Sequence, residues 1–267
     1  MTDVATRRPA FTAADVKLLG TQIGYEQKSY WRNPAAAFFT FAFPLVFFFI
    51  LTTFAGGQTD SSDLGSGVHL SQYYTPSILS YAIMSACFLS IAMNVVRKRE
   101  EGVLKRYRGT PLPTTALLGG FIGSAVLIAI LLTVVVIAAG ELIFSVHLAA
   151  ANLPEVALVV VLAALVFCAL GIAVSSLIPN DDAGPAIVNL PFFVLVFISG
   201  TYFPISGTLA KVADWLPLRP LIEGLEQQFL PGAPDINSFG HNVFVLAIWG
   251  VGATIFAIRH FKWVPNR

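Results

Sequence analysis

The residues best placed to do chemistry lie in one short, densely charged segment. It spans residues 97–108, reads RKREEGVLKRYR, and is followed directly by GTPLP. The sequence lacks the motifs HExxH, GxSxG and GxxxxGK[ST] and has no Cys and His metal spacing, so catalysis or nucleotide binding by these residues is not indicated. What this segment can supply is electrostatic: it can anchor a membrane protein at the surface or dock on a soluble partner.

The elements that position this segment are long apolar helices. With 56% hydrophobic residues, 12% charged residues and a mean hydropathy of +0.75, the chain lies outside the composition of soluble domains. A helix needs about 20 apolar residues to cross the roughly 30 Å hydrocarbon core. Six stretches free of Asp, Glu, Lys, Arg and His meet this need: 35–54, 74–96, 114–140, 156–178, 183–203 and 242–258. We therefore predict an all-α integral membrane protein with six transmembrane helices over residues 35–267.

The basic residues predict the orientation in the plasma membrane. Fourteen of the sixteen Lys and Arg residues lie before the first span, between the second and third, or after the last. Because cytoplasmic loops carry excess Lys and Arg, we expect both termini and the loop 97–113 in the cytoplasm. The spans hold no ionisable residue, which disfavours internal ion coupling. A transport function would therefore need an outside energy source.

The N-terminal segment, residues 1–34, is predicted to hold an amphipathic helix over residues 11–33 that lies on the membrane surface. Thr12 and Asp15 have capping-box spacing, and Pro34 ends the helix. Apolar residues recur at helical spacing, while other positions are polar. The apolar positions are Val16, Leu19, Ile23 and Tyr30, and the polar ones are Lys17, Gln22, Glu26 and Lys28. The alternative is a leader that only aids solubility.

The outer segment 204–240 is too apolar for an ordinary loop. Residues 209–216 carry one apolar helical stripe, and Pro220 is placed to open a second short helix. Neither helix is long enough to span the membrane. The segment is interpreted as a re-entrant hairpin or lid, with a peripheral loop as the alternative.

The charged loop itself also has two interpretations. It can be a topogenic anchor whose charge holds the second and third spans in place. Alternatively, Val103, Leu104 and Tyr107 form a small apolar patch on one side of a short charged helix, which suits docking on a soluble protein. We favour docking.

These features resemble the membrane permeases of ABC type 2 exporters, which serve bacterial drug, antibiotic, lipid and polysaccharide export. The resemblance covers nearly the whole chain. It rests on the amphipathic N-terminal segment, on RKREEGVLKRYRGTPLP after the second span, and on SGTYFP at the end of the fifth span followed by WLPLRPL. The fourth-to-fifth connection, 179–182, is shorter than a second ATPase contact would need.

The resemblance implies a dimer of two permease chains, each bound to a separate ABC ATPase that binds ATP and Mg. It implies export of a hydrophobic or amphipathic substrate, such as a drug, an antibiotic or a lipid-like molecule. This chain would be a transport subunit rather than an enzyme, with no cofactor of its own, membrane lipids as partners and no nucleic acid. A membrane-embedded sensor or scaffold and an ATP-independent facilitator remain the alternatives.

The resemblance also assigns site residues to four groups. The ATPase-coupling residues are Arg97, Arg99, Glu100, Glu101, Gly102, Lys105, Arg106, Thr110 and Pro111. The connecting-helix residues are Asp15, Lys17, Glu26 and Lys28. The substrate-path residues are Asn94, Asn189, Phe192, Phe193 and Phe197, and the outer-hairpin residues are Ser199, Gly200, Pro204, Pro217, Pro220 and Glu223.

Overall fold

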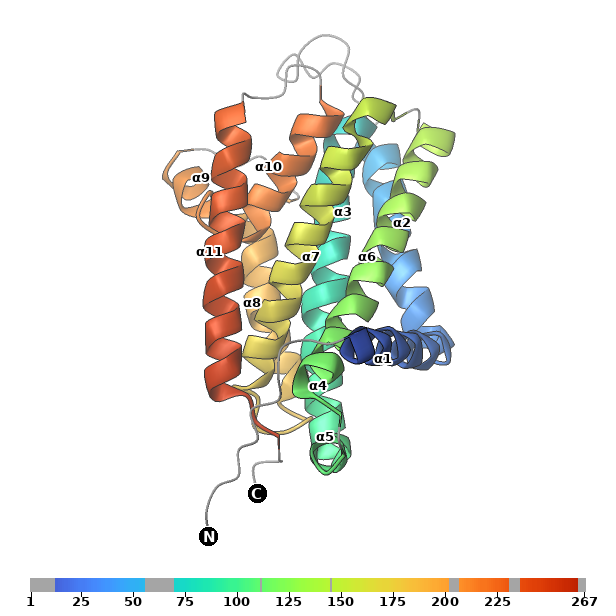
Figure 1. The fold of residues 1–267 in the computed structure, drawn as a ribbon. Helices are drawn as coiled ribbons and strands as arrows, with labels where there is room; N and C mark the ends of the chain where they lie inside the picture. The colour runs from blue at the N-terminus through green and yellow to red at the C-terminus, as the bar shows by residue number, and fades with distance from the viewer. Residues whose placement is uncertain are drawn as a thin grey trace.

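The regular elements of the protein are helices throughout the described residues. The computed structural model describes residues 13–55, 70–110, 112–144, 146–201, 207–230 and 236–263. Figure 1 shows long helices standing side by side, with α1 (Ala13–Trp31) lying across one end of the bundle. The predicted all-helical membrane protein is confirmed.

Within the described residues, four helices are long and apolar enough to cross a membrane, and they coincide with the second, third, fourth and sixth predicted spans. The second is continuous through α3 (Leu70–Met84), the π-helical turn η1 (Ser85–Leu89) and α4 (Ser90–Glu100). The others are α6 (Thr114–Phe144), η2 (Ala150–Asn152) with α7 (Leu153–Ser175), and α11 (Ile236–His260).

The first and fifth predicted spans are shorter apolar helices, α2 (Pro34–Ala55) and α8 (Gly184–Ile198). At about 1.5 Å per residue, α8 reaches roughly 22 Å, less than the roughly 30 Å core. It ends five residues before the predicted limit because Ser199 caps it and Gly200 follows with a φ of 78°, the left-handed conformation that stops a helix. A complete set of six spans stays a prediction.

Helix α7 lies at the centre of the bundle and packs against α3, α4, α6, α10 and α11. Its Gly171 faces the π-helical turn, where an added Cβ would lie 2.8 Å from the Phe88 carbonyl oxygen. A π-helical turn displaces the backbone outward. Glycine on the facing helix provides the space for it, and the two buried cysteines, Cys87 and Cys168, lie in the same core.

Two short helices form in the segment 204–240, as the sequence predicts. They are α9 (Thr208–Ala213) and α10 (Leu218–Phe229), and α10 packs on α3, α7 and α11. Figure 1 shows α10 toward the end of the bundle that is opposite α1. Helix α10 begins two residues before Pro220, so Pro220 lies in its first turn. The re-entrant character of the hairpin stays a prediction.

Candidate coupling site

A glycine turn redirects the chain after the second predicted span. Helix α4 ends at Glu100, Glu101 caps it, and Gly102 has a φ of 71°, which leads into α5 (Val103–Arg108). The Glu101 N–H donates to the Arg97 carbonyl at 2.9 Å and the Gly102 N–H to the Arg99 carbonyl at 3.0 Å. Glycine adopts this left-handed conformation without the penalty that a Cβ would add. The Glu-Glu-Gly sequence therefore sets the angle between α4 and α5.

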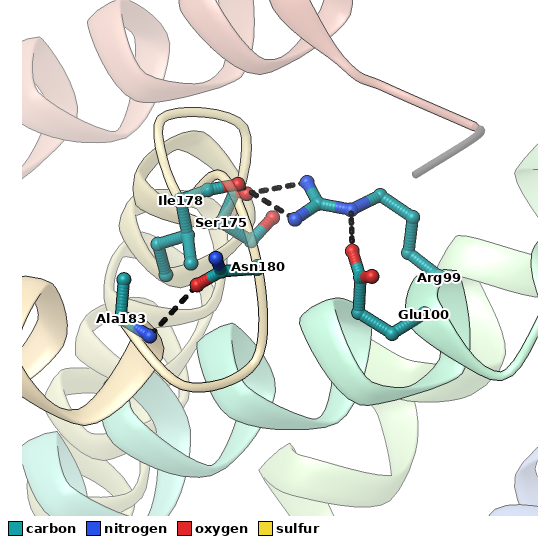
Figure 2. Close-up of polar contacts among 6 residues, drawn as sticks. All are labelled: Arg99, Glu100, Ser175, Ile178, Asn180 and Ala183. Carbon is teal, nitrogen blue, oxygen red and sulfur yellow. Dashed lines mark hydrogen bonds and ion pairs between the residues drawn. The ribbon is translucent and has the colours of Figure 1, made fainter. Parts of the chain in front are cut away.

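Arg99 holds this turn against the end of α7 (Figure 2). Its side chain is 1% exposed and donates to the carbonyl oxygens of Ser175 at 3.1 Å and Ile178 at 2.6 Å. Its Nε lies 3.4 Å from a carboxylate oxygen of Glu100. The guanidinium binds the carbonyl of Ser175, which the end of α7 leaves without an intrahelical partner, and the carbonyl of Ile178 in the loop that follows. Arg99, one of the predicted coupling residues, therefore faces the bundle and not the surface of the turn.

The remaining coupling residues lie on the surface of this turn. Glu101, Lys105 and Arg106 are exposed, whereas Leu104 is fully buried and attaches α5 to the bundle. The Thr110 hydroxyl donates to the Tyr107 carbonyl at 2.7 Å just after α5 ends. Pro111 lies outside the described residues. The result is a short charged helix with one apolar anchor at the end of the molecule (Figure 1).

Helix α1 is joined to α4 by a buried ion pair. The Lys98 ammonium lies 2.6 Å from the Glu26 carboxylate, and the two side chains are 16% and 8% exposed. The same ammonium lies 4.2 Å from the centroid of the Phe121 ring on α6. Gln27 Nε2 also donates to the Ser124 carbonyl of α6 at 2.9 Å. One cation therefore links α1, α4 and α6.

A row of glycines lets α1 approach α6 closely. A Cβ added at Gly120 would lie 2.3 Å from Cγ of Gln22, and one at Gly119 or Gly123 would lie 2.6 Å from a methyl carbon of α1. Gly119 and Gly123 have the small-xxx-small spacing that favours close helix packing in membranes. This spacing and Lys98 are signals that the sequence interpretation missed.

The predicted helix is present as α1, and the side that packs against the bundle includes two positions of the predicted polar set. Glu26 and Gln22 were expected on the polar face and are in fact buried, because they face α4 and α6. Val16, which was expected on the apolar face of a helix at the membrane surface, is 58% exposed on the surface of the protein. Lys17 and Lys28 are exposed, and Asp15 lies in the first turn of α1. Residues 11 and 12 lie outside the described residues.

The structure separates the predicted path residues. Phe192 is 1% exposed and packs edge-on against Tyr81 at 5.4 Å, so it lies in the core of the described structure. Phe193 and Phe197 are 52% and 62% exposed on α8, near the partly buried Asn189. Asn94 instead lines a cavity of about 410 Å³ between α1, α2, α4 and α6. This cavity has no lining residue from α8.

The outer-hairpin residues lie around the start of α10. Ser199 is buried, Gly200 ends α8, and Pro217 precedes α10. Glu223 pairs with Arg219 at 2.7 Å, and a second guanidinium nitrogen of Arg219 lies 3.5 Å from the Ser199 carbonyl oxygen. Thus α8 and α10 are joined through Arg219. Pro204 lies outside the described residues.

Comparison with known proteins bears on the part of the bundle from α3 to α11. A search of curated proteins finds no match. The sequence matches the family described as ABC-2 family transporter protein over residues 57–259. This range runs from before the second predicted span to the last residues of α11, and it includes the charged turn between α4 and α6. Because the match covers most of the chain, the protein belongs to the ABC-2 transporter family and is a membrane permease, a transport subunit.

Proposed function

We propose that this permease is the transmembrane subunit of an ATP-driven exporter, in which α5 receives force from a separate ATPase. The family generally combines a permease dimer with an ATPase partner, which supports this division of labour. ATP and Mg would bind to the partner. The observation that carries the proposal is an exposed, charged α5 attached to the bundle through Leu104, through Arg99 and through the Glu26–Lys98 pair.

Such an attachment suits the transmission of force. A displacement of α5 reaches α4 through the turn at Gly102, α7 through Arg99, and α1 and α6 through Lys98. The charged loop then acts as a docking element as well as a topogenic anchor. This proposal places both termini and α5 in the cytoplasm, in agreement with the distribution of basic residues.

The face of α2 and α8 supports a position for the second permease chain and for the path. Exposed aromatic side chains gather on these helices, among them Phe38, Phe39, Phe43, Phe49, Phe193 and Phe197. In the proposed dimer this face borders a path for a hydrophobic or amphipathic molecule, such as a drug or a lipid-like compound. Aromatic faces provide large apolar contacts without charge.

The test is purification of the tagged chain from its native membrane, with mass spectrometry of the proteins that accompany it. We expect an ATPase with a GxxxxGK[ST] loop to be recovered with the wild type and lost with the double variant Glu101→Ala, Arg106→Ala. A matched double variant of exposed residues outside the proposed sites, Glu155→Ala with Lys211→Ala, measures how far general loss of one acidic and one basic charge matters. Recovery of a regulatory protein instead would favour a sensor or scaffold. Substrate movement without any ATPase would favour a facilitator.

A further inference from the structure

The cavity beside α4 carries a pattern of polar groups, two of which, Arg97 and Glu101, are also proposed coupling residues. Ser90, Asn94, Arg97 and Glu101 are exposed and follow one another at intervals of four, three and four residues. At 3.6 residues per turn they share one face of the helix. All four line the cavity of about 410 Å³ between α1, α2, α4 and α6. A polar stripe that runs from the apolar part of a spanning helix to its charged end needs polar partners along its length.

The charges that this cavity offers to a ligand are one positive and one negative. Glu26 and Lys98 also line it, but they neutralise each other at 2.6 Å. Arg97 and Glu101 lie about 6 Å apart along the helix axis. Neither takes part in an ion pair within the described residues. The cavity therefore presents a separated cation and anion with no net charge.

We propose that this cavity binds the headgroup of a zwitterionic aminophospholipid, as in phosphatidylethanolamine. In such a lipid the acyl chains lead to glycerol esters, then to a phosphate, then to an ammonium. Along α4 toward the end where α5 lies (Figure 1), Asn94 comes first, then Arg97, then Glu101. Asn94 donates to an ester, Arg97 binds the phosphate and Glu101 binds the ammonium. Ile91, Ala125 and Ile128 of the lining contact the upper acyl chains.

The order of the groups is what selects this ligand. A lipid at either membrane surface places its phosphate nearer to the hydrocarbon than its ammonium, so the match does not depend on which side of the membrane α5 faces. Arginine is well suited to phosphate because its planar donors bind two oxygens together. An anionic lipid without an amine would leave Glu101 unpaired and close to its negative charge. The cavity volume lies within the range of small-molecule sites.

The test measures lipid retention by the full chain and does not depend on transport, so its failure and failure of the exporter proposal are distinguishable. The purified protein is stripped of lipid and titrated with phosphatidylethanolamine or phosphatidylglycerol of the same acyl chains, and bound lipid is counted by native mass spectrometry. The wild type should retain one phosphatidylethanolamine molecule and bind it more tightly than phosphatidylglycerol. Arg97→Gln should weaken retention of phosphatidylethanolamine about tenfold, because a hydrogen bond to a charged group is lost.

Two further variants separate the roles. Glu101→Gln should remove the preference for phosphatidylethanolamine by weakening its binding while leaving that of phosphatidylglycerol unchanged or stronger. Arg259→Gln removes an exposed cation at the end of α11, outside the cavity, and should change neither. Tighter binding of phosphatidylglycerol by the wild type, no retained lipid, or equal effects of Arg97→Gln and Arg259→Gln would overturn the proposal.

A second measurement needs no variant of these residues. A photoreactive phosphatidylethanolamine added to the wild-type protein in nanodiscs should label peptides that contain the polar stripe of α4 or the facing part of α1. Labelling confined to other helices would overturn the assignment of the cavity.

Discussion

Replacement of Arg99 by Met should destabilise the bundle far more than replacement of the exposed Arg106. Met keeps most of the volume but leaves the Ser175 and Ile178 carbonyl oxygens, now bonded at 3.1 and 2.6 Å, without a donor. Each hydrogen bond from a charged group contributes about 1.5 to 3 kcal/mol. Because Met also avoids the cost of burying a charge, we expect a net loss of about 3 kcal/mol.

The assay is a thermal melt of the purified variants in one detergent. For a chain of this size, about 3 kcal/mol corresponds to a fall in Tm of roughly 6 to 12 °C. Arg99→Lys keeps the charge but can reach both carbonyls less well, so its Tm should be intermediate. Hydrogen exchange should rise in residues 176–183 in the Met variant. Equal melting of Arg99→Met and Arg106→Met would refute the anchoring role.

Three other predictions concern the packing of α1, the turn before α5, and α10. Gly120→Val should separate α1 from α6, because a Cβ there would lie 2.3 Å from Gln22. Proteolysis between α1 and α2 should become faster, and an unchanged rate of proteolysis would contradict the close approach of the two helices. Gly102→Val should lower the free energy of unfolding by about 1 to 2 kcal/mol, because Gly102 has a φ of 71°. Gly102→Asn should lower it less, and a thermal melt measures both variants. Equal losses of stability in the two variants would argue against the left-handed turn. The pKa of Glu226 is raised, chiefly by burial, with Arg219 lowering it and Glu223 raising it. Because the folded protein then binds the proton more tightly than the unfolded chain, its stability falls as pH rises above the pKa of Glu226 in the unfolded chain. Glu226→Gln should therefore be as stable as the wild type at low pH and more stable at pH 7, and parallel profiles of stability against pH for the two proteins would contradict this.

Much of the architecture was accessible from the sequence because hydrocarbon excludes charge. Long stretches free of ionisable residues predicted where the helices of the bundle lie, whereas the turn at Gly102 that separates α4 from α5 was not predicted. The end of α8 was placed too late, since uncharged residues continue past Ile198 while the backbone conformation of Gly200 ends the helix. Hydropathy records the cost of transfer into lipid, and it carries no information on local backbone conformation.

The partners of the charged residues were decided by the tertiary structure. Arg99 finds carbonyls 76 and 79 residues away, and Lys98 finds Glu26 at a separation of 72 residues. The sequence gives the charge of Arg99 but not the direction of its side chain, which depends on the end of α7 lying beside it. The cavity that combines Asn94, Arg97 and Glu101 with α1 arises in the same way. The sequence by itself determined which segments must avoid water, because that depends on each side chain alone, whereas the positions of the paired charges depend on how the helices pack.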